Sequence, residues 1–255
     1  MTKVTNFFVK NNFDLTDQNY WINLYKPKDI SSAFAVKIIK KITKAKKVGH
    51  GGTLDPFATG VLPIAINKST KQSSMIMNYK KKYYFKIIFG EFRDSDDITG
   101  KVIEYSEKRI SLVDFAKNIP NFIGKINQQP SKFSAIKING ERSYNLARQG
   151  LDVEMPFREI EIYLIKILNY FPDFCEMEIE CSKGTYVRSL VRDICKKNNI
   201  CGYVGELKRK YVGDFLIDKT ISLDELKNIV NFGEYNKDGS LLALHEKQKI
   251  AKKMI

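Results

Sequence analysis

Residues 48–63, VGHGGTLDPFATGVLP, decide which fold and which function this sequence indicates. They place four glycines and two prolines around one acidic residue, Asp55. Glycine-rich segments serve two different purposes in proteins: their backbone amides can bind a phosphate, or their turns can present a single side chain to a substrate. The two possibilities require different flanking residues, so the neighbouring sequence separates them.

A phosphate-binding loop is disfavoured by the residues around the glycines. A P-loop has the pattern Gly-x-x-x-x-Gly-Lys-Ser/Thr, whereas Gly60 is followed by the apolar residues 61–63. A dinucleotide fingerprint requires a strand before its glycines and a helix after them. Here a lysine-rich helical segment precedes the glycines, and two prolines interrupt residues 53–63. The segment lacks the lysine and the hydroxyl that hold a nucleotide phosphate.

A rigid turn that presents Asp55 fits the residues better. The first three glycines permit positive φ, and Pro56 pushes Asp55 out of the α region onto extended backbone. The apolar run 61–66 then anchors the loop in the core. A carboxylate held in this way suits a nucleophile or a general base. Asp-Pro is also a common structural turn, and from this stretch alone a structural aspartate is the simpler interpretation.

The charge of the chain favours a polyanionic partner. Its 255 residues include 43 Lys and Arg against 29 Asp and Glu, for a formal net charge of +14. Each phosphate that a cation neutralises releases counterions, so a basic surface binds nucleic acid readily. A lysine-rich proteome would produce the same surplus. The hydrophobic share of 43% is that of an ordinary globular protein.

Cysteine and histidine usage argues against a metal site and a disulfide framework. The four cysteines form no C-x-x-C pair, and the chain has two histidines. We therefore expect reduced thiols and no zinc site. We expect no export signal in the polar segment 1–19, which we interpret as a loose leader, and no stretch long enough to span a bilayer. The cytoplasm is the simplest location.

Periodicity and turn signals predict a mixture of strands and helices. We expect strands at 20–27, 79–90, 158–171 and 175–182, helices at 31–47, 111–119, 143–150 and 185–199, and a helix after the capping box Ser222-x-x-Glu225. Strict βαβ alternation is missing from this order. The expected fold class is therefore α+β, one domain around a mixed, mostly antiparallel sheet.

Two of the predicted helices carry informative patterns. In 31–47, capped by Ser31 or Ser32, an apolar stripe of Phe34, Ile38 and Ile42 is expected to face the core, with six lysines outside. In 185–199, five apolar residues share one face, namely Val187, Leu190, Val191, Ile194 and Cys195. Arg188 and Arg192 lie four residues apart and are expected to project together from another face.

The opening stretch also resembles a known signature, and it does not stand alone. GHGGTLDPFATGVLPI is similar to the motif of the TruB family of tRNA pseudouridine synthases. LYKPKDISS resembles the first Lys-Pro block of that family, residues 128–150 resemble its long Pro-Ser…Ala-Arg-x-Gly block, and CSKGTYVRSLVRDI resembles its Gly-Thr-Tyr-x-Arg turn. The blocks occur in family order from about residue 20 to 214.

The resemblance implies the pseudouridine-synthase fold, with a central sheet flanked by helices and an active-site cleft across the sheet. It implies a catalytic domain at 20–230, followed by a short tail at 231–255 without the PUA-type RNA-binding domain that is common in the family. The weaker grip on the outer part of the tRNA is then expected to be offset by the lysine-rich stretches 37–47, 80–82 and 247–253.

The implied activity is the isomerisation of uridine to pseudouridine at position 55, in the T-loop of tRNA. The enzyme flips the base out of its stack, breaks the N-glycosidic bond and rejoins the uracil through C5. The partner is the tRNA T stem-loop, with no membrane, no obligatory protein partner and a monomeric enzyme. One alternative is a non-catalytic tRNA-folding chaperone on the same scaffold. A second is the related guide-RNA-dependent synthase subunit, whose assembly relies on the C-terminal domain that we expect to be missing here.

The resemblance implies that the reaction needs no metal and no organic cofactor. It also assigns site residues. Asp55 is the implied nucleophile, attacking either the sugar or the base, and Arg188 is the arginine that pairs with it. Tyr83 is implied to stack on the base and relay a proton. Tyr186 contacts the substrate, and Leu207 forms an apolar wall.

Three further positions adjoin this implied site. His50 suggests a general base by its chemistry, but the resemblance places it in RNA binding, holding the loop open around the displaced base. We expect Tyr84, next to Tyr83, to point to the opposite face of its strand and into the core. Arg93 and Ser95 depart from the two threonines that the family often carries.

Overall fold

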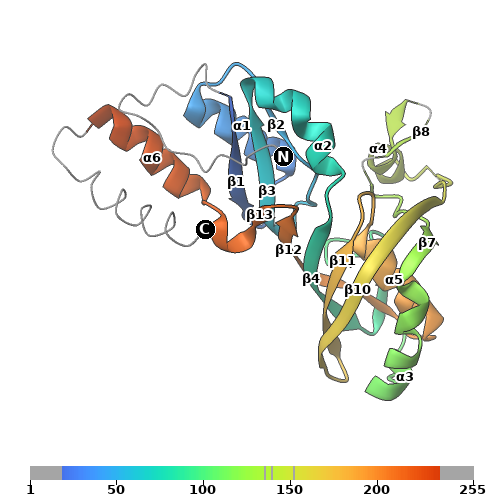
Figure 1. The fold of residues 1–255 in the computed structure, drawn as a ribbon. Helices are drawn as coiled ribbons and strands as arrows, with labels where there is room; N and C mark the ends of the chain where they lie inside the picture. The colour runs from blue at the N-terminus through green and yellow to red at the C-terminus, as the bar shows by residue number, and fades with distance from the viewer. Residues whose placement is uncertain (1–18, 135, 139, 152, 236–255) are drawn as a thin grey trace.

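The computed structural model describes residues 19–235 except 135, 139 and 152. In this part of the chain a nine-stranded sheet forms the centre of the fold (Figure 1). Seven strands lie in the order β1 (Tyr20–Lys26), β3 (Thr59–Ile66), β12 (Gly202–Val212), β4 (Lys81–Phe89), β11 (Phe174–Cys181), β10 (Arg158–Tyr170) and β7 (Gly124–Gln128). Two short strands, β2 (Val48–His50) and β13 (Phe215–Leu216), pair with β3 and β12. The expected mixed sheet is confirmed.

The described strands of the sheet all pair antiparallel except β3 and β12, which run parallel and divide the sheet into two parts. This pairing is short, joining Lys208 to Thr59 and Arg209 to Gly60. Gly60 has a φ of 101°, and a Cβ at this position would collide with the Arg209 carbonyl oxygen. Only glycine lets the two halves of the sheet approach this closely, so Gly60 is required at the seam.

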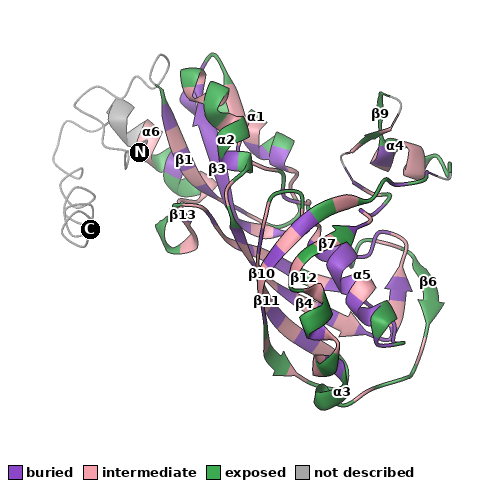
Figure 2. Ribbon diagram, turned by 45° about the vertical axis from the view of Figure 1, so that its right-hand side comes forward, coloured by how far each residue is buried: buried purple, intermediate pink, exposed green. Residues whose placement is uncertain are grey.

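Helices cover the two halves separately. On one half, α5 (Val187–Lys197) and α3 (Leu112–Lys117) contribute to a core shared with β4, β10 and β11. On the other, α1 (Ser32–Thr43) and α6 (Leu223–Tyr235) enclose a second core with β1 and β3. The short α2 (Ser73–Met77) covers part of β3 through Ile76 and Val61. Figure 2 shows buried residues concentrated along these strands and α5.

Smaller elements decorate this frame. The hairpin of β5 (Glu91–Arg93) and β6 (Val102–Tyr105) was not predicted, nor was that of β8 (Lys137–Ile138) and β9 (Glu141–Arg142). The helix α4 (Ser143–Arg148) lies where the sequence predicted one. None of the helices in the described ranges is long and apolar enough to cross a membrane. The predicted leader falls almost wholly outside the described residues, as does most of the predicted tail.

The helix predicted at 31–47 is shorter than expected. Ser31 is its cap and accepts a hydrogen bond from the Phe34 amide at 3.0 Å, as predicted. The helix ends at Thr43, because Lys44 adopts the left-handed conformation with a φ of 53°. The chain is then free to form β2 before the Asp55 loop.

The predicted apolar stripe of this helix was wrong at Phe34, whereas Ile42 packs against the core as predicted. Phe34 is 48% exposed, whereas Ala35 and Ile39 are fully buried. The reason lies at Ser32, whose Oγ accepts from the Leu54 amide at 2.8 Å and donates to the Leu54 carbonyl at 2.9 Å. Because Ser32 must face inward, the buried face is rotated away from Phe34.

The prediction that Tyr84 enters the core was also wrong. Burial alternates along β4, and Tyr83 occupies the buried face with Phe85 and Ile87. Tyr84 lies on the opposite face and is partly exposed. That face carries charged pairs, among them Lys82 with Glu178 at 2.9 Å. A strand buried on one face only can place one of two consecutive tyrosines in the core.

The helix predicted at 185–199 is present as α5, and its five apolar residues are all buried. The capping box before α6 is confirmed: the Glu225 amide donates to Ser222 Oγ at 3.1 Å, and the Ser222 amide donates to Glu225 Oε2 at 2.7 Å. Strands β10 and β11 pair antiparallel around Pro172 and Asp173, again as predicted.

Candidate active site

A cavity of about 610 Å³ opens at the seam between the two halves of the sheet. Its walls come from the loop before β3, from β4 and β12, from residues 156–159 and from the turn that begins α5. Five predicted site residues line it together: Asp55, Tyr83, Tyr186, Arg188 and Leu207. The sixth, His50, is not among the lining residues. A cavity of this volume is large enough for a nucleotide-sized ligand.

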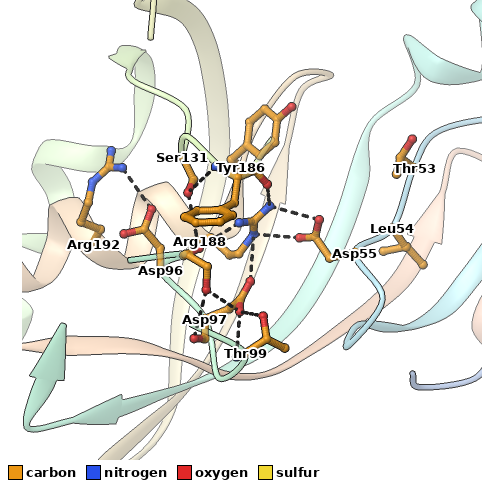
Figure 3. A network of polar contacts seen from close by, with 12 residues as sticks. Thr53, Leu54, Asp55, Asp96, Asp97, Thr99, Ser131, Tyr186, Arg188 and Arg192 are labelled. Atoms are coloured by element: carbon orange, nitrogen blue, oxygen red, sulfur yellow. Dashed lines mark hydrogen bonds and ion pairs between the residues drawn. The ribbon is translucent and has the colours of Figure 1, made fainter. Parts of the chain in front are cut away.

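Asp55 and Arg188 form a bidentate ion pair in this cavity (Figure 3). Arg188 Nε donates to Asp55 Oδ2 at 2.8 Å, and Nη2 donates to Oδ1 at 3.1 Å. The Arg188 side chain is 3% exposed, whereas that of Asp55 is 30% exposed. The carboxylate is therefore anchored from behind by a buried cation while part of its surface still faces the cavity.

A second carboxylate stabilises the same guanidinium. Burial alone would lower the pKa of Arg188, but Asp55 and Asp97 outweigh it and raise that pKa. Asp97 Oδ2 lies 3.5 Å from Arg188 Nε. Asp97 Oδ1 in turn accepts from the Ser95 and Thr99 hydroxyls at 2.8 and 2.6 Å and from the Thr99 amide at 2.9 Å. Arg188 is therefore charged and tightly oriented.

Arg192 extends the network one turn further along α5. Its Nη1 contacts Asp96 Oδ2 at 3.1 Å, and its Nη2 donates to the Gln129 carbonyl at 2.7 Å. Burial raises the pKa of Asp96 to about 6 despite this partner. The prediction that Arg188 and Arg192 project together is confirmed, since both contact the acidic loop 94–97 (Figure 3).

The two departures from the family pattern stabilise this loop. Ser95 supplies one of the hydroxyls that bind Asp97, and its carbonyl accepts from Arg188 Nη1 at 2.8 Å. Arg93 bonds Glu91 and donates to the carbonyls of Ile98 and Gly100 at 2.9 and 3.3 Å. The substituted residues therefore hold the loop shape that orients Arg188.

The backbone on both sides of Asp55 is held by buried cations that sequence reasoning missed. Arg209 is 1% exposed and donates through all three guanidinium nitrogens: to the Val61 carbonyl at 2.7 Å, to Gly52 at 2.9 Å and to Thr53 at 3.3 Å. A buried arginine can satisfy three carbonyls at once because its donors are fixed in a planar fork. The loop before Asp55 is thus bonded to β12.

Lys26 holds the other side. Its ammonium is fully buried and donates to the Pro56 carbonyl at 3.1 Å and to those of Pro27 and Ile30, both at 2.8 Å. Burial lowers its pKa to about 8, and the Asp55 charge partly opposes this shift. The sequence pointed to Lys26 only through the Lys-Pro pair that resembles the first family block. Nothing in that pair indicates that the lysine contacts the Asp55 loop.

Tyr83 and Leu207 form adjacent parts of the wall. Tyr83 is 7% exposed, and burial raises the pKa of its hydroxyl. Leu207 is 5% exposed and pairs with Phe85 across β12 and β4, which places it near Tyr83. Together they offer an aromatic ring and an apolar side chain close to the carboxylate.

Tyr186 is positioned by a residue far away in sequence. The Gln128 side-chain amide bonds the Tyr186 backbone twice, accepting from its N–H at 2.8 Å and donating to its carbonyl at 3.0 Å. Gln128 is 1% exposed, so this clamp is buried. It fixes the turn from which α5 begins and from which Arg188 projects.

His50 lies on β2, opposite Ile64, and its Nδ1 accepts from the Gly52 amide at 3.3 Å. Burial, reinforced by the charge of Arg209, lowers its pKa. The imidazole is therefore neutral at physiological pH and contacts the loop that leads to Asp55.

The predicted lysine stretch 80–82 is only partly a surface feature, since Lys81 is 6% exposed and donates to the Met77 and Tyr79 carbonyls.

The arrangement suits covalent chemistry on a flat, uncharged ring. A carboxylate oriented by an arginine can act as a nucleophile, and the aromatic and apolar walls can hold a base that has left its stack. In the described ranges no cluster of three or more His, Cys, Asp or Glu side chains has the geometry of a metal site.

Known proteins share this fold and these motifs. A chain in the crystal structure of a Cbf5-Nop10-Gar1 complex superposes with a TM-score of 0.68 at 25% identity, over 88% of this chain and 56% of that one. A family model described as TruB family pseudouridylate synthase (N terminal domain) matches residues 40–187, more than half of the chain. The molecule has the pseudouridine-synthase fold.

Curated relatives narrow the assignment. The tRNA pseudouridine synthase B of Ehrlichia chaffeensis is 45% identical over 213 residues, which cover 83% of this chain and 72% of that protein. The protein of the same name from Clostridium tetani is 46% identical over 214 residues, covering 83% and 74%. The chain belongs to the TruB family of pseudouridylate synthases.

Proposed function

We propose that this protein converts uridine to pseudouridine at position 55, in the T-loop of tRNA. The relatives that it resembles over most of its length are named tRNA pseudouridine synthase B. The observation that carries the proposal is the bidentate pair of Asp55 and Arg188 inside the cavity at the sheet seam. A protein that only bound RNA would not require a partly exposed carboxylate held by a buried arginine inside a cavity.

Each wall of the cavity has a part in this reaction. A uridine flipped out of the T-loop enters and meets Tyr83 and Leu207, which replace its stacking partners. The Asp55 carboxylate attacks the ribose or the base, the N-glycosidic bond breaks, and the uracil turns so that its C5 bonds to the ribose. Arg188 keeps the Asp55 carboxylate oriented through its two hydrogen bonds throughout.

Two further residues act on the RNA around the flipped base. Tyr186 lines the entrance above Arg188 and contacts the nucleotide. His50, neutral and outside the cavity lining, holds the RNA loop open on the outer side of the Gly52 turn. The enzyme works as a monomer in the cytoplasm, with tRNA as its partner and without an obligatory protein subunit.

The test is release of tritium from an unmodified tRNA transcript labelled at C5 of uridine, using the purified protein alone. Wild type is expected to release one tritium per tRNA, and Asp55→Asn is expected to release none while binding the transcript as wild type does. Asp214→Asn, which removes an exposed carboxylate from the turn after β12, serves as the matched control and retains full activity.

Two outcomes would overturn the proposal. Tritium release by Asp55→Asn at the wild-type rate would remove the nucleophile assignment. Binding without release by the wild-type protein would favour a tRNA-folding chaperone instead. Size-exclusion chromatography of the active fraction tests the monomer.

A further inference from the structure

Five cationic side chains line the catalytic cavity: Lys81, Arg158, Lys183, Arg188 and Arg209. Three of them already have partners inside the protein. Arg188 bonds Asp55, Arg209 bonds three backbone carbonyls, and Lys81 donates to two more. These three hold the protein's own groups. The remaining two cations have a different environment.

Arg158 is the unusual member of the set. It is the first residue of β10, and its Nε is buried without a hydrogen-bond partner in the described part of the chain. Its guanidinium lies over the ring of Tyr186, 5.8 Å from the ring centroid. A buried donor is costly to leave unbonded, so native proteins seldom do so without a reason. Nε itself is covered, but Arg158 as a whole is partly exposed and lines the cavity, so a ligand there can bring an acceptor to the rest of its guanidinium.

Nearby carboxylates do not neutralise Arg158. Glu159 also lines the cavity, but its carboxylate pairs with Lys125 at 3.2 Å. Asp55 is engaged by both donors of Arg188. The positive charge of Arg158 is therefore available to the cavity.

Lys183 also lines the cavity. It is exposed, and it belongs to the turn between β11 and α5 that also carries Tyr186. An arginine that lies over the Tyr186 ring and an exposed lysine thus line one cavity, and neither forms an ion pair with a carboxylate in the described part of the chain.

We propose that Arg158 and Lys183 bind a backbone phosphodiester of the RNA, in one of the two linkages of the uridine that enters the cavity. This inference rests on the proposed function. Uracil and ribose are uncharged, so the phosphodiester is the group of the substrate that can neutralise a cation. The planar guanidinium fork matches phosphate oxygens, and a charge-assisted bond of this kind is among the stronger ones.

The test combines protein and RNA changes in equilibrium binding. T stem-loop RNAs carry a neutral methylphosphonate at the 5′ or the 3′ linkage of the target uridine, or neither. Binding is measured with Asp55→Asn protein, which prevents turnover, with and without Arg158→Gln. Arg109→Gln, which removes an arginine that contacts Asp173 far from the cavity, controls for loss of one positive charge.

We expect Arg158→Gln to weaken binding of the natural stem-loop on the order of 10-fold, and a methylphosphonate at one linkage to weaken it equally. Combining that RNA with Arg158→Gln is expected to cost nothing more, because both changes remove the same bond. Arg158→Lys should retain part of the affinity. Lys183→Gln should cause a smaller, salt-dependent loss, as expected for an exposed cation.

Independent effects of Arg158→Gln and both methylphosphonates would overturn the proposal, as would unchanged binding by a folded Arg158→Gln protein. A thermal melt shows whether that variant is folded. The binding measurement does not depend on turnover. Absence of tritium release from the wild-type enzyme would therefore count against the proposed function without affecting the phosphate site.

Discussion

Arg188 holds both carboxylate oxygens of Asp55 from 133 residues further along the chain, at 2.8 and 3.1 Å. The same guanidinium also donates to the carbonyls of Ser95 and Phe133, so its plane is fixed from several sides. The orientation of the candidate nucleophile therefore depends on the start of α5, which carries Arg188, and on the segments around Ser95 and Phe133 that bind it.

Arg188→Lys tests whether this geometry or only the charge matters. Lysine keeps the cation but cannot make two parallel bonds to one carboxylate. We expect single-turnover tritium release to slow by about 10²-fold or more, because small errors in aim are costly in catalysis. RNA affinity should change little. Release at the wild-type rate would mean that a nearby positive charge is sufficient.

Tyr83→Phe separates stacking from proton transfer. The ring remains in its buried position on β4, and only the hydroxyl is lost. If that hydroxyl relays a proton, turnover should fall by about 10²-fold with unchanged binding of the stem-loop. Tyr83→Leu removes the ring as well and should also weaken binding. Equal turnover by Tyr83→Phe and wild type would reduce Tyr83 to a stacking surface.

Arg209→Lys tests the mounting of the loop. A lysine cannot reach the Gly52, Thr53 and Val61 carbonyls together, so the loop before Asp55 loosens. We expect kcat to fall by about 10²-fold with little change in KM, together with a lower Tm. Lys208→Met, one residue earlier and paired with Glu206, is the control. A lower Tm with normal kcat would limit Arg209 to a structural role.

His50 predicts a pH dependence of stability. Its pKa is lowered in the folded protein, whereas in the unfolded chain it is near the usual value of about 6.5. Below that pH the unfolded state binds the proton more readily, so stability falls as pH drops from about 6.5 toward the folded-state pKa.

Thermal melts at pH 7.5 and pH 5.5 measure this effect. The loss of Tm on acidification should be larger for wild type than for His50→Gln, which leaves His245 as the other histidine of the chain. Asp96, whose raised pKa of about 6 acts in the opposite direction, is common to both proteins and cancels in the comparison. Identical losses in the two proteins would show that His50 titrates normally.

Local sequence was a good guide to elements and a poor guide to which face of them is buried. The alternation of β4 and the caps of α1 and α6 depend on neighbouring residues, and they were predicted. The inward face of α1 was not, because Ser32 turns inward to bond the Leu54 backbone, a partner that no helical periodicity can indicate. Tyr84 was wrongly assigned to the core because alternation along a strand identifies two faces but does not show which of them is covered.

The motifs found five residues that line one cavity, since their resemblance to a family block carries tertiary information that periodicity lacks. The residues that support them were missed. In the sequence, Lys26, Gln128 and Arg209 look like any polar residues of a strand. Only their burial and their bonds to backbone groups in the structure show that they support the site.

The sequence alone determined that Asp55 sits between glycines and a proline, that Arg188 opens an amphipathic helix, and that strands and helices mix in an α+β order. Tertiary structure alone decided that these two residues meet, that β3 and β12 run parallel at a seam closed by Gly60, and that Arg158 borders the cavity with its Nε unbonded within the described ranges. The physical reason is that backbone preferences act between near neighbours, whereas ion pairs and burial depend on segments that only the completed sheet brings together.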